Sequence, residues 1–419
     1  WHGGLTVLDE SDVEGRTKYL TDVKIPMQYA ELRNYYSKAI NIMRGTKNYS
    51  LKDIESPPKS ESNEFILNTD YFRYKGILYP AKPFCTIKAI EKAKMENGLT
   101  VIGNFEVKRI NFTNKSRAVS IEGYDYTDGI IKKINADVFI LCAGGLGSPK
   151  ILLESIKESQ TLTGLPIGKF IIDHPSGFVF KAKLRRRMKL ESLFGEPGDG
   201  YKIQYGFALN PHKLSISNHR NHIIYLRPAI SMKDPLLYDF LKRRLVGYKG
   251  KNIKFSDVLY LFRHTDLLFD VVNFKYGIFS STKYVSGLTF LEQFPSEQYR
   301  IACNQNSKFS IKWEVSKDDS QSVKMFLNKF FESHADIFED YIVFPEISKR
   351  LETSGHHSGG CRMASAPSNG VVDSNLRVFG VDNLFVVDGS VISYSGHANT
   401  GLTISALALK CADVVKTLL

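Results

Sequence analysis

Residues 136–156 have the sequence ADVFILCAGGLGSPKILLESI, and this stretch decides the fold class. Its apolar run predicts a buried strand, its Gly-Gly pair predicts a tight turn, and the remainder predicts a helix with Pro149 in its first turn. A strand that leads through a glycine turn into a helix is the unit of a doubly wound α/β sheet, whose ligands bind at the carboxyl ends of the strands. Taken alone, tight packing of the strand against the helix explains the glycines equally well.

The segments on either side predict an α/β domain that is interrupted. A helix is expected from about Thr86 to Asn97-Gly98, followed by two β-rich runs in 99–112 and by two strands joined at an Asp-Gly turn. Residues 176–345 carry short alternating strands, typical of an antiparallel sheet, and end in an amphipathic helix. After residue 350, strand, turn and buried strand return. The expected fold is α/β (α+β overall), with a substrate domain inserted into a nucleotide-type domain, and the expected divisions are 1–80, 81–175, 176–350 and 351–419.

Composition excludes several classes of protein. The chain has 419 residues with 43% hydrophobic and 24% charged residues, as globular proteins do, and it has no uncharged apolar span of transmembrane length. Five cysteines without a CxxC pair argue against a disulfide scaffold or a zinc site, and indicate a reducing, cytoplasmic location. The chain begins at Trp1 without a Met or a signal peptide, so we expect its true beginning to be missing.

The net charge of +12 is spread over the sequence, which favours a solvated basic surface. Residues 236–277 are the exception, because basic side chains alternate there with Phe, Tyr and Leu. An amphipathic insertion packed on its own domain is the favoured interpretation. A peripheral membrane contact and a stacking nucleic-acid face are the alternatives. No recognisable nucleic-acid motif is present, so no nucleic-acid partner is expected.

Two adjacent histidines stand between glycines in SGHHSGGCRM, residues 354–363. Histidine titrates near neutral pH, which suits a general base that takes a proton from an alcohol. Zinc binding is a poor alternative, because no further His/Cys group stands at ligand spacing, and no metal is expected. A pair of surface histidines in a loop is the remaining interpretation.

Near the end of the chain, YSGHANTG (394–401) opens an apolar helix that is expected to begin near Thr400. Asn399 is well placed as its N-cap, and Thr400 is the alternative cap. The positive end of this helix could also face an electron-rich acceptor such as a reduced flavin.

Together these stretches resemble the glucose–methanol–choline (GMC) family of FAD-dependent oxidoreductases. HHSGGCRM and the following residues to 415 resemble its closing signature, and ADVFILCAGGLGSPKILLESI resembles its strand–Ala-Gly–helix signature. IGKFIIDHPSG (167–177) resembles its Asp-His-Pro segment. WHGG at the start resembles the stretch after its Gly-Gly-Ser loop in the sugar-oxidising and bacterial dehydrogenase branches. The resemblance implies an FAD/NAD(P)-binding Rossmann-like three-layer domain around the antiparallel substrate domain.

Carried onto this chain, the resemblance implies His356 as the catalytic base and Asn399 as the second catalytic residue, with His397 as a neighbour. It also implies a set of contacts to FAD: Val107, Ala143, Gly144, Asp388, Gly389, Asn399, Thr400 and Gly401. The implied reaction is oxidation of a CH–OH group, with a sugar or polyol favoured as substrate. The electron acceptor stays open.

One departure from the family is large. Its N-terminal βαβ unit, with the GxGxxG turn that binds pyrophosphate, is absent from this sequence. Either the sequence is a fragment or another chain supplies the unit, and alone it should bind FAD poorly. The alternative hypothesis is therefore an FAD-free relative that serves as a scaffold or partner subunit.

Overall fold

The structure is a computed structural model, and it describes the following residues: 4–15, 24–44, 48–58, 64–82, 84–96, 98–113, 116–156, 159–190, 193, 195–216, 219–229, 232, 281–303 and 309–418. The basic aromatic stretch 236–277 lies outside these residues, so the membrane-surface interpretation of it stays a prediction. Within the described ranges, no helix combines the length and the apolar character that crossing a bilayer requires.

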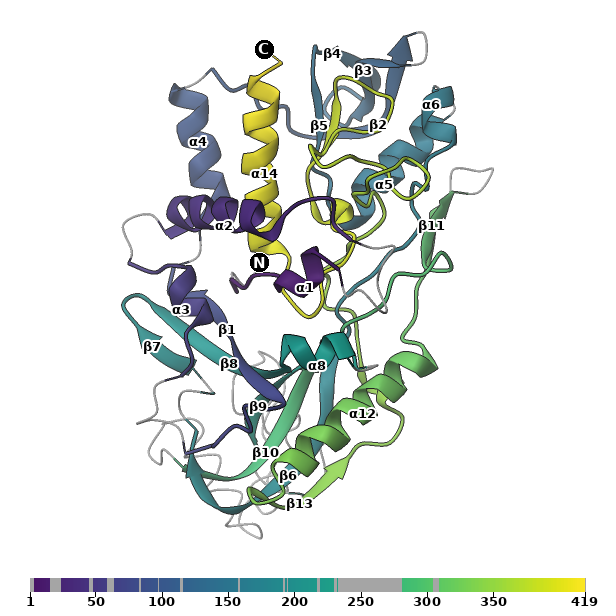
Figure 1. Cartoon of the computed structure of the whole chain (residues 1–419). Helices are drawn as coiled ribbons and strands as arrows, with labels where there is room; N and C mark the ends of the chain where they lie inside the picture. The colour runs from purple at the N-terminus through teal and green to yellow at the C-terminus, as the bar shows by residue number, and fades with distance from the viewer. Residues whose placement is uncertain are drawn as a thin grey trace, which may run out of the picture.

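The largest element is an antiparallel sheet, seen in the lower half of Figure 1. Its strands run in the order β1-β8-β9-β10-β6-β13, and β7 pairs with β8. The bounds are β1 Phe72–Pro80, β6 Ser176–Lys189, β7 Glu196–Gly198, β8 Tyr201–Leu209, β9 Ile223–Ala229, β10 Ser281–Phe290 and β13 Phe338–Val343. The expected antiparallel sheet within 176–345 is confirmed, and β1 adds an edge strand from far earlier in the chain.

Helix α12 (Lys317–Ser333) contributes aromatic side chains to the core beside this sheet. It begins at a capping box, in which Ser316 Oγ accepts from the Asp319 amide and the Asp319 carboxylate accepts from the Ser316 amide. Phe330 of α12 lies against Phe72 and Phe207 of the sheet, with ring centroids 5.6 and 5.5 Å away. This aromatic cluster fixes the helix and supports the sheet beneath it.

The α/β part is built around two parallel strands, β5 (Phe139–Leu141) and β14 (Leu384–Val386), which are paired although far apart in sequence. Helix α5 (Gly144–Ser155) follows β5 directly and packs on β2 of a second sheet, β2-β3-β4. Those three strands span Phe105–Thr113, Arg117–Asp125 and Ile130–Asn135. The expected α/β fold class is confirmed, and the described residues contribute two parallel strands to it.

The structure corrects three local expectations. The helix after β5 begins at Gly144, so Pro149 lies inside it and not in its first turn. The strand expected to be buried has one open face, because Ile140 of β5 is 47% exposed. Residues 99–103 form no strand, and β-rich character alone does not make one where no partner strand lies beside it.

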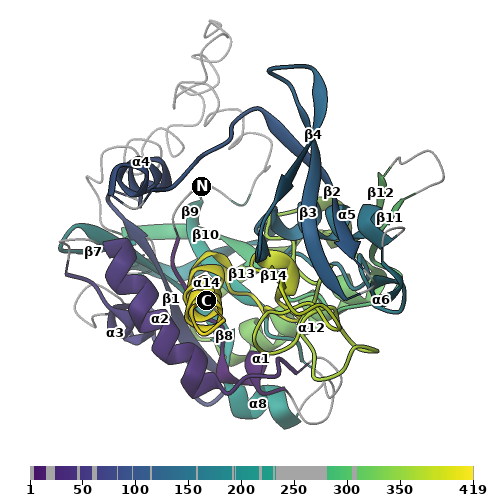
Figure 2. The same ribbon diagram turned by 90° about the horizontal axis from the view of Figure 1, so that it is seen from above.

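Three helices complete the upper half of the molecule. Helix α14 (Gly401–Lys416) packs against α2 (Tyr29–Arg44), whereas α4 (Thr86–Glu96) buries none of its side chains. Figure 2 shows α4 standing apart from the β2-β3-β4 sheet. The remaining elements are α1 Glu10–Val13, α3 Leu51–Glu55, α6 Gln160–Thr163, α8 Pro211–Ile216, β11 Arg300–Cys303, β12 Phe309–Lys312, α13 Ile347–Arg350 and η4 Gly389–Val391.

Candidate active site

The carboxyl ends of the two parallel strands are joined by one buried carboxylate. Asp388, directly after β14, accepts a hydrogen bond from the Gly144 amide at 2.9 Å and another from the Ser148 hydroxyl. Its second oxygen accepts from the Ser390 amide at 2.9 Å and from the Ser390 hydroxyl at 2.6 Å. Asp388 therefore holds the turn before α5 against the turn before η4, and its oxygens are already engaged within the protein.

The turn that carries the two histidines packs on both of these turns. The carbonyl oxygen of His357 lies so close to Gly145 that a Cβ there would meet it at 2.1 Å, and a Cβ at Gly389 would meet it at 2.7 Å. The next residues pair with the η4 segment, since the Cys361 amide donates to the Ser390 carbonyl at 2.9 Å. Glycine is needed at these two positions because backbone approaches backbone there.

His356 lies in this turn and is partly buried. Its Nδ1 atom is buried and has no hydrogen-bond partner among the described residues. Burial lowers the pKa of His356 below its ordinary value; the charge of Asp173 opposes that shift, and His357 adds to it. At neutral pH the ring is therefore neutral, which is the form that can accept a proton.

Asn399 lies at the start of α14, where it is half-buried among buried neighbours. The N-cap position belongs to Thr400, the alternative cap of the sequence analysis, and no side chain caps the first turn of the helix. Gly401, the first helical residue, is exposed, and a Cβ there would meet no atom within 4 Å. The amino end of α14 therefore opens onto free space.

His397 has a different environment from His356. It is buried, and its Nδ1 lies 3.0 Å from the carbonyl oxygen of Asn221. Burial lowers its pKa to about 3; the nearby Asp9 carboxylate opposes this, and Lys75 and Arg73 add to it. His397 thus remains neutral through the physiological range and contributes to the structure of the loop before Asn399.

The other predicted contacts divide into two groups. Ala143 and Gly144 lie at the amino end of α5, where Gly144 has φ +83° and a Cβ would meet no atom. Val107 lies on β2, where it is half-buried against the core. In sequence it is distant from the carboxyl ends of β5 and β14. The structure tests none of these as FAD contacts, and they remain predictions.

Two residues that the sequence analysis did not assign to the site also contact it. Asp173 accepts hydrogen bonds from the backbone of the His356 turn, and the His174 ring lies edge-on to the His356 ring with centroids 5.7 Å apart. The Asp-His-Pro match was the available signal. The local sequence of 167–177 does not indicate that Asp173 and His174 contact the distant turn of His356.

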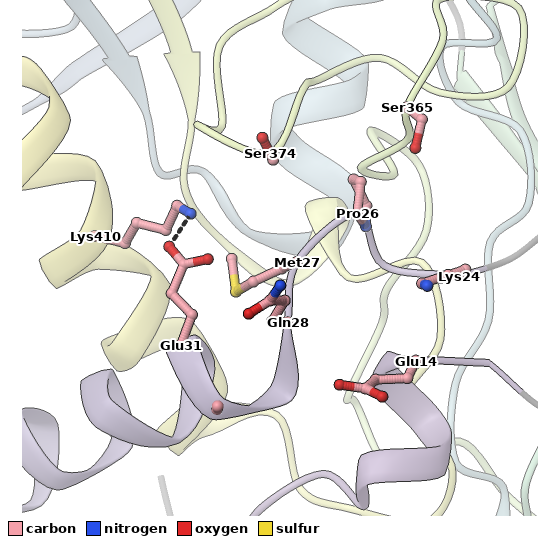
Figure 3. Close-up of a pocket in the computed structure, with 10 residues that line it drawn as sticks. Glu14, Lys24, Pro26, Met27, Gln28, Glu31, Ser365, Ser374 and Lys410 are labelled. Carbon is pink, nitrogen blue, oxygen red and sulfur yellow. Dashed lines mark hydrogen bonds and ion pairs between the residues drawn. The ribbon is translucent and has the colours of Figure 1, made fainter.

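A separate cavity of about 760 Å³ lies beside α14 and the amino end of α2, as Figure 3 shows. It is lined by Glu14, Lys24, Pro26, Met27, Gln28, Ala30, Glu31, Ser365, Ser374 and Lys410. Glu31 and Lys410 form an ion pair across it. None of the predicted catalytic or FAD-binding residues lines it, and among the described residues no cluster of His, Cys, Asp or Glu suits a metal ion.

Comparison with known proteins identifies the family. Two family models described as GMC oxidoreductase match the chain, one over residues 85–176 and one over residues 316–408. A cholesterol oxidase from Acinetobacter baumannii is 42% identical over 90 residues, which are 21% of this chain and 16% of that protein. A 2-methyl-1,2-propanediol dehydrogenase from Mycolicibacterium austroafricanum is 22% identical over 317 residues, which are 72% of this chain and 52% of that protein.

The structural comparison agrees with the fold. Pyridoxine 4-oxidase from Mesorbium loti superposes with a TM-score of 0.52 at 15% identity, covering 94% of this chain and 72% of the other. The chain spans about half the length of the dehydrogenase that it matches. The two matched ranges contain β5, α5, the His356 turn, Asp388 and the start of α14. The chain belongs to the GMC family of FAD-dependent oxidoreductases.

Proposed function

We propose that the protein containing this chain oxidises a CH–OH group of a sugar or polyol with FAD, using His356 as the base. The observation that carries the proposal is the state of His356: its ring is neutral, its Nδ1 has no partner, and its turn packs on the glycine turn after β5. A neutral imidazole next to a ligand-binding strand end is suited to proton abstraction from an alcohol.

The residues present fit FAD at the strand ends. The space beside Gly144 and Gly401 is free, and the amino end of α14 carries backbone amides without a side-chain cap. Such an end stabilises negative charge on a neighbouring group. Ala143, Gly144, Asn399, Thr400 and Gly401 would hold the cofactor here, and Asp388 would hold the two turns in place. FAD, when bound, supplies the acceptor for the hydride that leaves the carbinol carbon.

The chain's own residues then have distinct tasks. His356 accepts the hydroxyl proton, and Asn399 donates a hydrogen bond to the same oxygen and orients it. The antiparallel sheet shapes the substrate pocket, as its position in the insertion implies. A sugar or polyol is favoured by the family branches that the sequence resembles, and relatives of the chain include a glucose oxidase and the large subunit of a fructose dehydrogenase.

The test is substitution of His356 in the whole protein. His356→Ala should lower the rate of flavin reduction by an alcohol about 10²–10⁴-fold, the usual range for loss of a general base. Flavin absorbance of the purified protein should be unchanged. His357→Ala is the neighbouring-histidine control: it removes a ring that lowers the pKa of His356 but is not the proposed base, so most of the turnover should be kept. Unchanged turnover in His356→Ala would remove His356 from this role, and absence of any flavin in the wild-type protein would favour the scaffold hypothesis.

The pH profile gives a second readout. A base works in its neutral form, so kcat/KM should fall as pH decreases through the pKa of His356. Because burial lowers that pKa below 6.5, the acid limb should lie below pH 6.5. A limb above pH 7 would contradict the assignment.

A further inference from the structure

Asp173 is a buried carboxylate, far from His356 in sequence, that accepts hydrogen bonds from the turn of His356. It is 1% exposed and follows the short extended segment around Ile172, which pairs with Ser358. One oxygen accepts from the His356 amide at 3.0 Å, and the other accepts from the Gly355 amide at 3.3 Å and from the Thr353 hydroxyl. All three donors lie in the turn that carries the proposed base.

The next residue, His174, lies near both the turn of His356 and the loop that leads into Asn399. It is fully buried, and its amide donates to Asp173 at 2.7 Å. Its ring lies edge-on to the ring of His356. Burial lowers the pKa of His174, and the backbone of Gly396 and Ala398 opposes that shift, which places the ring near the loop that leads into Asn399. Neither ring nitrogen has a hydrogen bond of ordinary geometry among the described residues.

We propose that Asp173 and His174 are a positioning pair, which fixes the turn of His356 against the loop of Asn399 so that both side chains act on one substrate oxygen. This inference rests on the proposed function. Neither residue is assigned to contact the substrate. Asp173 acts on the backbone of the turn, and His174 acts as a spacer between the His356 ring and the loop before α14.

Besides holding the turn, the negative charge of Asp173 raises the pKa of His356. Burial alone would raise the pKa of Asp173, but the hydrogen bond from Thr353 and the nearby His174 and His357 lower it overall, so the carboxylate is ionised. Within the described ranges, three titratable groups face His356: Asp173, which raises its pKa, His357, which lowers it, and the neutral ring of His174, 5.7 Å away between centroids. For His174, burial first and then the charge of His356 lower the pKa to about 4, so its ring is neutral.

The experiment compares Asp173→Asn with the wild-type protein, in the whole FAD-loaded enzyme. Asparagine keeps the shape but removes the charge that favours protonated His356. We expect the pKa of His356, followed by NMR of labelled histidine, to decrease, and kcat/KM to fall about tenfold or more through misplacement of the base. Hydrogen exchange of the Gly355 and His356 amides should become faster, since these amides lose a carboxylate acceptor.

Asp373→Asn is the matched control, because Asp373 orders its own turn through the amides of Asn375 and Arg377 at 2.8 and 3.0 Å. It should leave the pKa of His356 unchanged. If Asp173→Asn does not fold, Thr353→Val removes one donor to Asp173 and should still speed exchange at His356. Exchange at Gly355 is not a readout for this variant, because the Gly355 amide also donates to the Thr353 hydroxyl oxygen at 3.1 Å. Unchanged exchange together with an unchanged His356 pKa would overturn the proposal.

The two proposals fail in distinguishable ways. If the wild-type protein oxidises no alcohol, the proposed function fails, whereas the NMR titration and the exchange rates still report whether Asp173 holds the His356 turn. If Asp173→Asn alters neither the His356 pKa nor the exchange rates while His356→Ala abolishes turnover, His356 remains the proposed base and the positioning pair is rejected.

Discussion

Gly145 is the residue at which the glycine turn after β5 meets the backbone of the His356 turn. A Cβ there would meet the His357 carbonyl oxygen at 2.1 Å, a distance that only a backbone shift could relieve. Gly145→Ala should therefore lower the free energy of unfolding by about 1–3 kcal/mol, the usual cost of overpacking. It should also lower flavin content, because the displaced turn belongs to the proposed FAD site. Urea denaturation and the flavin-to-protein absorbance ratio would measure both effects.

Gly164→Ala provides the control for this substitution. A Cβ at Gly164 meets no atom within 4 Å, and the residue ends α6 away from the strand ends. Its stability and flavin content should stay close to those of the wild-type protein. Equal behaviour of the two variants would show that contact with the His357 carbonyl does not constrain the turn.

The sequence predicted the glycine turn but could not separate the roles of its two glycines. Gly144 needs a positive φ and Gly145 needs room for a carbonyl from residue 357, and the second requirement exists only in the folded chain. Likewise, His356 was predicted from its motif. The carboxylate of Asp173 that holds it lies far away in sequence, and local patterns carry no information on such a contact.

At the scale of elements, helix α4 presents an apolar face that stays exposed among the described residues. Ile87 is 69% exposed and Ile90, one turn further on, is 39% exposed. Changing both to Lys in the 419-residue chain should lower binding of a fluorescent hydrophobic dye and leave the melting temperature within about 2 °C, because neither side chain contributes to the core. Fluorescence titration and thermal unfolding would measure this.

Ile42→Lys on α2 is the matched control for α4. Ile42 is 54% exposed, and the other isoleucine of that helix, Ile40, is buried. It should change dye binding much less than the α4 double substitution. A similar decrease in both would mean that the dye reports scattered isoleucines and not a continuous face. The bounds of α4 followed well from its helical periodicity, whereas its exposure did not, since periodicity predicts an apolar face but not what covers it.

At the scale of the whole molecule, a buried charge cluster joins three segments that lie far apart in the chain. The Asp9 carboxylate pairs with Lys75 of β1 at 2.6 Å and with Arg73, and it accepts from the Asn221 amide group at 2.9 Å. Asp9→Ala would leave Lys75 buried without its partner, so stability should fall by about 3–5 kcal/mol. Denaturant unfolding of the whole protein would measure the loss.

Two further variants separate burial from pairing in this cluster. Adding Lys75→Met to Asp9→Ala should restore part of the stability, because the unpaired buried charge is then removed. Lys349→Ala breaks an exposed pair with Glu346 and should cost less than about 1 kcal/mol. If Asp9→Ala cost no more than Lys349→Ala, the cluster would contribute nothing beyond a surface ion pair.

The general architecture was predictable because each part carries a local pattern: alternation for the antiparallel strands, and a strand–glycine–helix sequence for the α/β part. The assembly of those parts was less accessible. Pairing of β5 with β14 and attachment of β1 to the sheet both join residues more than a hundred positions apart, and such pairings depend on the whole core.

The contacts of Gly145 and Gly389 with the His357 carbonyl also bear on how such a protein can change over generations. Three turns from separate parts of the chain share one backbone interface, so a turn exchanged singly for that of a relative would meet neighbours shaped for another. The strands and loops of the antiparallel sheet take no part in those glycine contacts. Under the proposed function, in which this sheet shapes the substrate pocket, substrate range can therefore diversify there by exchange of whole loops, while the three turns are inherited as a block.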